Sequence, residues 1–165
     1  MKRFTSVLVV ILMVGLIAGC TKPTGQDDFK KGNVIFIHPD GVGLADWHIM
    51  RALYYGPDTE SNWDKLPYIG LYRGHTANSL TTSSHAGATM HSYGVKVKRD
   101  SYGMDGTEEV TALSGKKMSI MQEAMESGIL TGIINSGTIV EPGTGVFVAS
   151  DKSRGNREAI ADKIV

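Results

Sequence analysis

The chain has 165 residues, with 17 Lys and Arg against 17 Asp and Glu, so its formal net charge is zero. This balance excludes the strongly basic character on which nucleic-acid binding depends, and the length suits a single domain. Cys20 is the only cysteine in the sequence, which excludes an intrachain disulfide.

The first 20 residues have the pattern of an export signal. The basic start MKR precedes the apolar run VLVVILMVGLIAG, and polar TKPTGQDD follows; this run is too short for a membrane-spanning helix of about 20 apolar residues. Residues 16–20, LIAGC, resemble a bacterial lipobox, whose cysteine is lipidated. We therefore expect residues 1–20 to be removed, Cys20 to anchor the protein in the outer membrane facing the periplasm, and residues 21–32 to form a polar tether. An ordinary cleaved signal with an incidental cysteine is the alternative.

The rest of the chain predicts alternating strands and helices. Residues 33–43, NVIFIHPDGVG, begin with β-branched side chains and end at Pro-Asp-Gly, which predicts a buried strand and then a loop. In residues 44–56 the apolar positions recur about every three residues, which predicts a helix that ends at Gly56. Further strands are predicted at 66–74 and 130–139, and further helices at 85–94, 115–128 and 156–165. This order is typical of an α/β domain with a mainly parallel sheet flanked by helices.

Polar residues follow each predicted strand, where ligands of parallel sheets gather. Asp40 follows the first, a hydroxyl run at 81–84 follows the second, and SGTIVEPGTG at 136–145 surrounds the end of the third. Asp40 suits a divalent cation, although an aspartate before glycine is also an ordinary turn former. Similarly, one hydroxyl of the run is expected to cap the helix that follows. A hydroxyl there also lies beside unpaired backbone N–H groups, where a phosphoryl group can bind.

Three ordered motifs resemble the alkaline phosphatases. They are PDGVG at 39–43, SHAGATMHSYGVK at 84–96 and TGVFVASDKSR at 144–154, the last with a one-residue gap. The resemblance implies an alkaline-phosphatase-like α/β fold and a phosphomonoester hydrolase that acts through a phosphoserine intermediate, with two Zn²⁺ ions and one Mg²⁺. It makes Ser84 the nucleophile, with Thr82 in reserve. Asp40 would then bridge zinc and magnesium, Thr144 would bind magnesium, and Arg154 would bind the substrate phosphate.

Two residues beside Ser84 depart from the family pattern. Ser83 stands where the family has an aspartate that helps to orient the arginine, so that residue is absent or replaced. His85 stands where the family has a small residue, and it is the histidine expected nearest to the substrate. Because no two histidines have the i, i+4 spacing of a helical zinc site, all five are interpreted as surface or cleft residues. They are His38, His48, His75, His85 and His91.

The family's remaining zinc ligands and its magnesium-binding glutamate lie beyond the position of Arg154. We therefore expect residues 33–165 to correspond to the N-terminal part of a catalytic domain, with the fold incomplete at its C-terminus and the chain inactive alone. A homodimer is possible by resemblance. The alternatives are a sulfatase or phosphodiesterase of the same superfamily, and a non-catalytic phosphate-binding lipoprotein.

Overall fold

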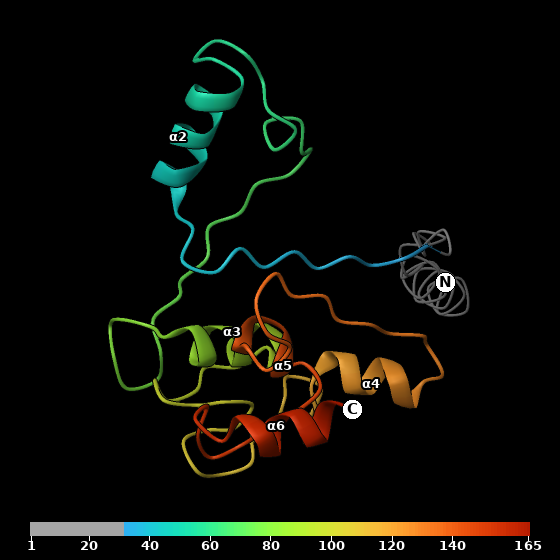
Figure 1. Ribbon diagram of the computed structural model, residues 1–165. Coiled ribbons are helices and arrows are strands. Elements are labelled where there is room, and N and C mark those ends of the chain that lie inside the picture. The colour runs from blue at the N-terminus through green and yellow to red at the C-terminus, as the bar shows by residue number, and fades with distance from the viewer. Residues whose placement is uncertain (1–31) are drawn as a thin grey trace, which may run out of the picture. The chain divides into compact units, whose positions relative to one another are not determined.

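The computed structural model describes residues 32–165, which form five helices (Figure 1). The predicted signal at 1–20, with Cys20, and almost all of the tether at 21–32 lie outside the described residues. The chain divides into two compact units between Ile37 and His38, and the five helices belong to the second. No helix in the described part is long and apolar enough to cross a bilayer. The helices are α2 (Leu44–Tyr54), α3 (Ser84–Tyr93), α4 (Ile120–Glu126), α5 (Pro142–Gly145) and α6 (Arg157–Ile164).

The parallel sheet predicted from the sequence is not confirmed within residues 32–165. The segments 33–43, 66–74 and 130–139 form no strand, and only two isolated β-bridges occur in the described chain. An isolated strand is unstable because its backbone groups and its apolar faces need neighbouring strands or helices to cover them. These segments have the predicted apolar composition but no such neighbour. Their side chains are consequently exposed, as in Val34 (96%), Ile69 (93%), Leu71 (98%) and Leu130 (100%).

All four predicted helices are present, and their lengths follow from their caps. Helix α4 is shorter than predicted because Ser119 caps it. The Ser119 hydroxyl accepts a hydrogen bond from the Gln122 N–H at 3.1 Å, and the Gln122 side chain accepts one from the Ser119 N–H at 2.9 Å. The four-residue helix α5 is absent from the sequence-based expectation. It begins at Pro142, whose ring fixes a φ angle suited to a first helical turn.

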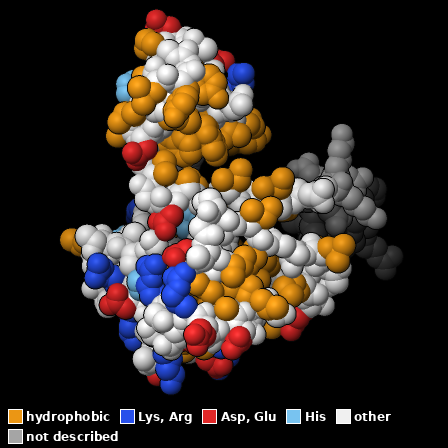
Figure 2. All heavy atoms as spheres, viewed as in Figure 1, with side chains coloured by type: hydrophobic (Ala, Val, Ile, Leu, Met, Phe, Trp, Pro, Cys, Tyr) orange, Lys and Arg blue, Asp and Glu red, His pale blue; other side chains and the backbone are white. Residues whose placement is uncertain are grey.

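Helix α3 lies at the centre of the packing, in contact with α5 and α4. Its fully buried Ala86 and Ala88 have small side chains, which let neighbouring segments approach the helix closely. Ala88 belongs to one apolar cluster, together with Tyr102, Val140, Val146, Phe147, Ala149 and Ile160. Ala86 belongs to a second, together with Met90, Tyr93, Val97, Val110 and Ala112. By contrast, α2 buries no residue, and Figure 2 shows many hydrophobic side chains on the molecular surface.

Thr89 fixes α3 to the turn at residues 101–103. Its buried hydroxyl lies 2.7 Å from the His85 carbonyl oxygen and 3.1 Å from that of Ser101, and it accepts a hydrogen bond from the Gly103 N–H at 2.8 Å. One hydroxyl can donate to either carbonyl while it accepts from Gly103. Gly103 has a φ angle of +63°, and a Cβ there would come within 2.8 Å of a neighbouring side chain. The turn therefore requires glycine at this position.

Tyr102 joins the same turn to two later segments of the chain. Its hydroxyl donates to the Val140 carbonyl oxygen at 2.7 Å, just before α5, and its own carbonyl oxygen accepts from the Asp151 N–H at 2.9 Å. Burial, with the nearby Glu141 carboxylate, raises the pKa of Tyr102 to about 12. The hydroxyl therefore stays protonated at neutral pH and remains a donor to Val140.

Asp151 organises the loop between α5 and α6. One carboxylate oxygen accepts from the Ser153 N–H at 3.0 Å and from the Asn156 side chain at 2.7 Å, and the other accepts from Lys163 at 3.0 Å. Burial by itself would raise the pKa of Asp151, but these three hydrogen bonds outweigh it, and the pKa lies below its usual value. The loop is thus tied to itself and to α6, with Arg154 inside it.

We predict that Gly145→Ala destabilises the protein through Tyr102. A Cβ on Gly145 would lie 2.1 Å from the Tyr102 hydroxyl, so the buried ring must shift and its bond to Val140 must break. The expected loss is about 1–3 kcal/mol in the free energy of unfolding, measured by urea titration. Gly132→Ala, where an added Cβ meets nothing within 4 Å, is the matched control and should change stability by less than about 0.5 kcal/mol. Equal effects of the two substitutions would contradict this account.

We predict that the contribution of Asp151 to stability depends on pH. Because its pKa is lowered on folding, the stabilisation is present above the pKa of an unfolded aspartate, about 3.9, and is lost as the pH falls through the lower folded value. Wild type should exceed Asp151→Asn in unfolding free energy at pH 6, and the gap should narrow steadily below about pH 4. Asp162→Asn on α6, whose carboxylate makes no hydrogen bond in the described chain, is the control. A gap that stays constant down to pH 3 would show that charge at Asp151 is immaterial.

Candidate active site

The hydroxyl run ends at the first residue of α3. Ser83 is the N-cap: its hydroxyl accepts from the Ala86 N–H at 3.3 Å and donates to the Arg99 carbonyl oxygen. The capping hydroxyl and the candidate nucleophile therefore belong to two neighbouring residues, Ser83 and Ser84. Because Ser83 performs the capping, the side chain of Ser84 is free to face another group.

Asp40 and Ser84, which are 44 positions apart in the chain, meet at the start of α3. The Ser84 hydroxyl donates a hydrogen bond to Asp40 Oδ1 at 3.1 Å. Asp40 stands in a turn whose next residue, Gly41, has a φ angle of +72°, a conformation that glycine adopts without strain. Thr82, the reserve candidate, bonds instead to the backbone carbonyl of Ser83 at 3.3 Å. Of the two hydroxyls, Ser84 is the one in contact with a carboxylate.

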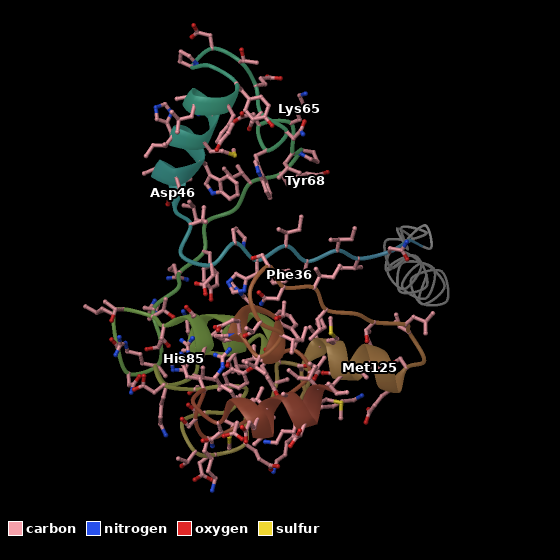
Figure 3. The ribbon with its side chains drawn as sticks, in the orientation of Figure 1. Phe36, Asp46, Lys65, Tyr68, His85 and Met125 are labelled. Carbon is pink, nitrogen blue, oxygen red and sulfur yellow. The ribbon has the colours of Figure 1, made fainter. Side chains whose placement is uncertain are left out.

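His85 lies on α3 directly after Ser84, and its side chain is largely buried (Figure 3). Its side chain is 12% exposed, Nε2 lies 3.7 Å from Asp100 Oδ1, and the buried Nδ1 has no hydrogen-bond partner. Burial, followed by the nearby Arg154 guanidinium, lowers the pKa of His85 against the opposing effect of Asp100. The imidazole is therefore neutral at neutral pH, and its position next to Arg154 brings that arginine near the start of α3.

Arg154 is held by a glutamate that the sequence analysis did not single out. Its Nη2 donates to Glu141 Oε2 at 3.2 Å, while the side chain remains 44% exposed. Glu141 is the N-cap residue of α5 and stands within the stretch SGTIVEPGTG, which was expected to carry ligand-binding residues. An acidic residue in that stretch, opposite an exposed arginine, was the signal that could have identified it.

Thr144 lies on α5, and its hydroxyl makes hydrogen bonds only with residues 135–141 in the described chain. Its hydroxyl accepts from the Asn135 side chain at 2.9 Å, a second residue that sequence reasoning missed. At the adjacent Gly143 an added Cβ would lie 3.5 Å from His38 Nδ1, so the segment that leads to Asp40 passes beside α5. No hydrogen bond in the described chain joins Thr144 to Asp40 or Ser84. The structure thus brings Ser84 and Asp40 into direct contact, whereas Thr144 hydrogen-bonds to neither of them.

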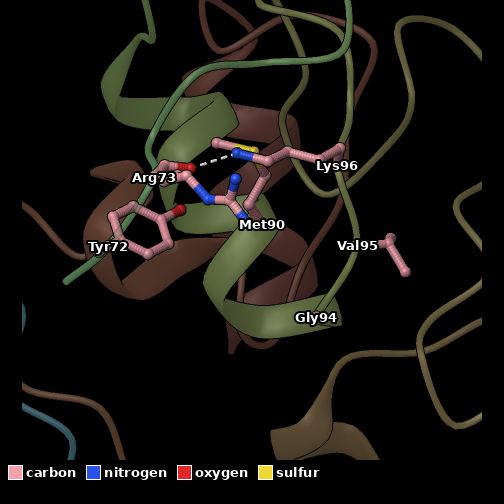
Figure 4. Close-up of a pocket in the computed structure, with 6 residues that line it drawn as sticks. All are labelled: Tyr72, Arg73, Met90, Gly94, Val95 and Lys96. Carbon is pink, nitrogen blue, oxygen red and sulfur yellow. Dashed lines mark hydrogen bonds between the residues drawn. The ribbon is translucent and has the colours of Figure 1, made fainter. Parts of the chain in front are cut away.

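Lys96 and Gly94 have structural roles at the far end of α3. Gly94 ends the helix with a φ angle of +72°, and Lys96 donates to the carbonyl oxygens of Arg73 and His75. The lysine therefore fixes the segment that leads into the hydroxyl run. The cavity in Figure 4, of about 240 Å³, lies here at the C-terminal end of α3, away from Ser84. Its lining consists of Tyr72, Arg73, Met90, Gly94, Val95 and Lys96.

The described residues do not build a complete metal site. Within 32–165 no three side chains of His, Cys, Asp or Glu gather closely enough to hold an ion. His38 and His91 pack edge to face, with ring centroids 4.9 Å apart, and burial together with His38 lowers the pKa of His91. Near Ser84 the structure provides one carboxylate, Asp40, together with hydroxyl oxygens. Such oxygen donors suit magnesium, but they are too few for a four-coordinate zinc site.

Comparison with known proteins identifies the relatives of this chain. It matches the alkaline phosphatase family over residues 31–164. It is 26% identical over 169 residues to "Alkaline phosphatase 4" of Bacillus subtilis, covering 93% of this chain and 35% of that protein. It is 25% identical over 171 residues to "Repressible alkaline phosphatase" of Saccharomyces cerevisiae, covering 97% of this chain and 29% of that protein. With the feline "Alkaline phosphatase, tissue-nonspecific isozyme" the identity is 28% over 114 residues, 63% of this chain and 22% of that protein.

The chain thus spans at most about a third of the length of these curated relatives. No solved structure matches it significantly. The family match, however, includes α3 with Ser84, the turn with Asp40 and the loop with Arg154, and it extends over most of the sequence. The chain belongs to the alkaline phosphatase family, whose domains have an α/β fold.

Proposed function

We propose that this chain carries the nucleophile and the phosphate-binding arginine of a phosphomonoester hydrolase. The observation that carries the proposal is the 3.1 Å hydrogen bond from the Ser84 hydroxyl to Asp40 at the first turn of α3. A carboxylate at this distance can orient the hydroxyl and accept its proton. The N-terminal end of α3 adds unpaired N–H groups and a positive dipole end, both of which favour a bound phosphoryl group.

In the proposed reaction, Ser84 Oγ attacks the phosphorus of a phosphomonoester. The bond from phosphorus to the ester oxygen breaks, the alcohol leaves with a proton, and phosphoserine forms at Ser84. Water then attacks the phosphoserine, releasing phosphate and restoring the hydroxyl. In the first step Asp40 accepts the proton of the serine hydroxyl while the departing alcohol takes up a proton, and in the second step the serine oxygen regains the proton that the attacking water gives up. In both steps Arg154 binds non-bridging phosphate oxygens through its planar guanidinium. The neutral His85 packs beside these groups without adding a charge.

Metal ions and the sheet belong to the same proposal. We propose that Asp40 and Thr144 give oxygen ligands to the two Zn²⁺ and one Mg²⁺ ions of the family, with the other ligands outside residues 32–165. When bound, such ions supply Lewis-acid stabilisation of the phosphoryl oxygens.

We also propose that the exposed apolar segments 33–43, 66–74 and 130–139 are strands of the mainly parallel sheet in a complete domain. Their exposure and composition support this, because parallel strands are covered on both faces.

We predict that Ser84→Ala abolishes turnover, while Thr82→Ala does not. In the full-length protein that carries this chain, the first substitution should lower kcat for p-nitrophenyl phosphate on the order of 10³-fold or more, since it removes the attacking atom. Thr82→Ala removes a hydroxyl two residues away that makes no hydrogen bond to Asp40, and it should retain activity within a few-fold. Acid trapping with ³²P-labelled substrate should place the label on Ser84. Label on Thr82, with the two mutant effects exchanged, would identify threonine as the nucleophile.

Comparing kcat/KM for three substrates distinguishes the alternative activities of the same protein. A phosphomonoesterase should show its highest kcat/KM with a monoester and a much lower value with bis-p-nitrophenyl phosphate or p-nitrophenyl sulfate. A preference for the diester or the sulfate would reassign the reaction within the superfamily. Phosphate binding that persists in Ser84→Ala, with no turnover and no trapped label in wild type, would indicate a non-catalytic phosphate-binding protein.

We propose that Cys20 carries a lipid anchor, on the basis of the sequence LIAGC. Expressed in a bacterial host with radiolabelled palmitate, the wild-type protein should incorporate label and fractionate with the outer membrane. Cys20→Ser removes the thiol that accepts the lipid, so label should be lost and the protein should leave that fraction. Cys20→Ser that keeps wild-type fractionation would show that the segment is an ordinary signal.

A further inference from the structure

Glu141 lies between two arginines, Arg154 in the loop before α6 and Arg157 at the start of α6. Oε2 accepts a hydrogen bond from Arg154 Nη2 at 3.2 Å, and Oε1 accepts one from Arg157 Nη1 at 3.2 Å. Arg157 also donates to the Thr138 hydroxyl through its other terminal nitrogen. Each oxygen of the carboxylate is therefore occupied by a different guanidinium, which fixes the plane of the carboxylate as well as its position.

The backbone of Glu141 is held in place by hydrogen bonds of its own. Its N–H donates to the Thr138 carbonyl at 2.9 Å, and its carbonyl oxygen accepts from the Gly145 N–H at 2.8 Å, closing α5. On the other side, Arg157 is the first residue of α6, a helix anchored by the fully buried Ile160. Glu141 is thus held by its backbone hydrogen bonds and by Arg157, independently of its contact with Arg154.

Arg154 uses only part of its guanidinium in this contact. Nη2 is taken by Glu141, while Nη1 and Nε make no hydrogen bond to the described chain. The side chain is 44% exposed, and its charge acts on His85, the neighbour of Ser84. A long exposed side chain loses rotamer freedom when it binds a ligand, and a partner that orders it beforehand reduces that loss. Nη1, Nε and the second N–H of Nη2 are available for a phosphate.

We propose that Glu141, itself oriented by Arg157, is the positioning residue that orders Arg154 for an incoming phosphoryl group. The inference rests on the proposed function, because it assigns a task to Arg154. A simple electrostatic role predicts the opposite outcome: removing the negative charge of Glu141 would then strengthen phosphate binding.

The test uses the full chain and two isosteric variants, Glu141→Gln and Glu158→Gln. Both remove one carboxylate charge, but Glu158 on α6 makes no hydrogen bond in the described chain and serves as the matched control. The first readout is the ¹⁵N–¹H heteronuclear NOE of Arg154 Nε, assigned by its absence in Arg154→Lys. The second is the shift of the same resonance during titration with inorganic phosphate. The Thr89 amide, which lies in the packed part of α3, reports whether each variant remains folded.

We expect Arg154 Nε to be ordered in wild type and in Glu158→Gln, and mobile in Glu141→Gln. The apparent phosphate affinity at Arg154 should weaken by at least about tenfold in Glu141→Gln, the loss expected for one hydrogen bond to a charged group. Arg157→Gln, which leaves the carboxylate but frees one side of it, should show a smaller change in the same direction. Unchanged order of Arg154 in Glu141→Gln, or tighter phosphate binding, would overturn the inference.

The two proposals fail in different ways. If Arg154 loses order in Glu141→Gln but phosphate leaves its resonance unmoved in wild type, the positioning contact stands and the phosphate-binding function of Arg154 falls. If phosphate shifts the resonance equally in wild type and Glu141→Gln, the function stands and the positioning role of Glu141 falls.

Discussion

The hydrogen bonds of the turn at residues 101–103 hold together the parts of this protein on which the candidate site depends. The Tyr102 hydroxyl binds the Val140 carbonyl, its own carbonyl binds the Asp151 N–H, and the neighbouring Gly103 N–H binds Thr89. Three segments distant in sequence thus share one short turn. Because Tyr102 is 1% exposed, its hydrogen bonds are shielded from water and are costly to leave unmade.

Three of the four groups of the candidate site are carried by segments attached to this turn. Ser84 begins the helix that Thr89 fixes, Thr144 follows Val140 on α5, and Arg154 lies in the loop that Asp151 organises. Asp40 alone arrives from outside this arrangement, on a segment whose His38 packs against His91 of α3. Thus changes in the core, such as a side chain at Gly145, should reach the site through the backbone rather than through direct contact.

Burial and hydrogen bonds shift the pKa values of four side chains in the packed part of the structure around the site. Burial keeps Tyr102 protonated and favours neutral His85 and His91, while Asp151 is stabilised as a carboxylate. Glu141 lies between Arg154 and Arg157, so these three groups carry a net charge of +1 at neutral pH.

The sequence by itself determined four of the five described helices, the family and the order of the candidate site residues. Local sequence patterns located α2, α3, α4 and α6, since amphipathic spacing and capping residues act locally. They also located the apolar segments at 33–43, 66–74 and 130–139, but a strand requires a partner, and no local pattern reveals whether one is present. The tertiary structure alone decided that Ser83 is the cap, that Ser84 faces Asp40, and that Glu141 holds Arg154. These contacts join residues up to 44 positions apart, and sequence spacing cannot set distances that only chain packing creates.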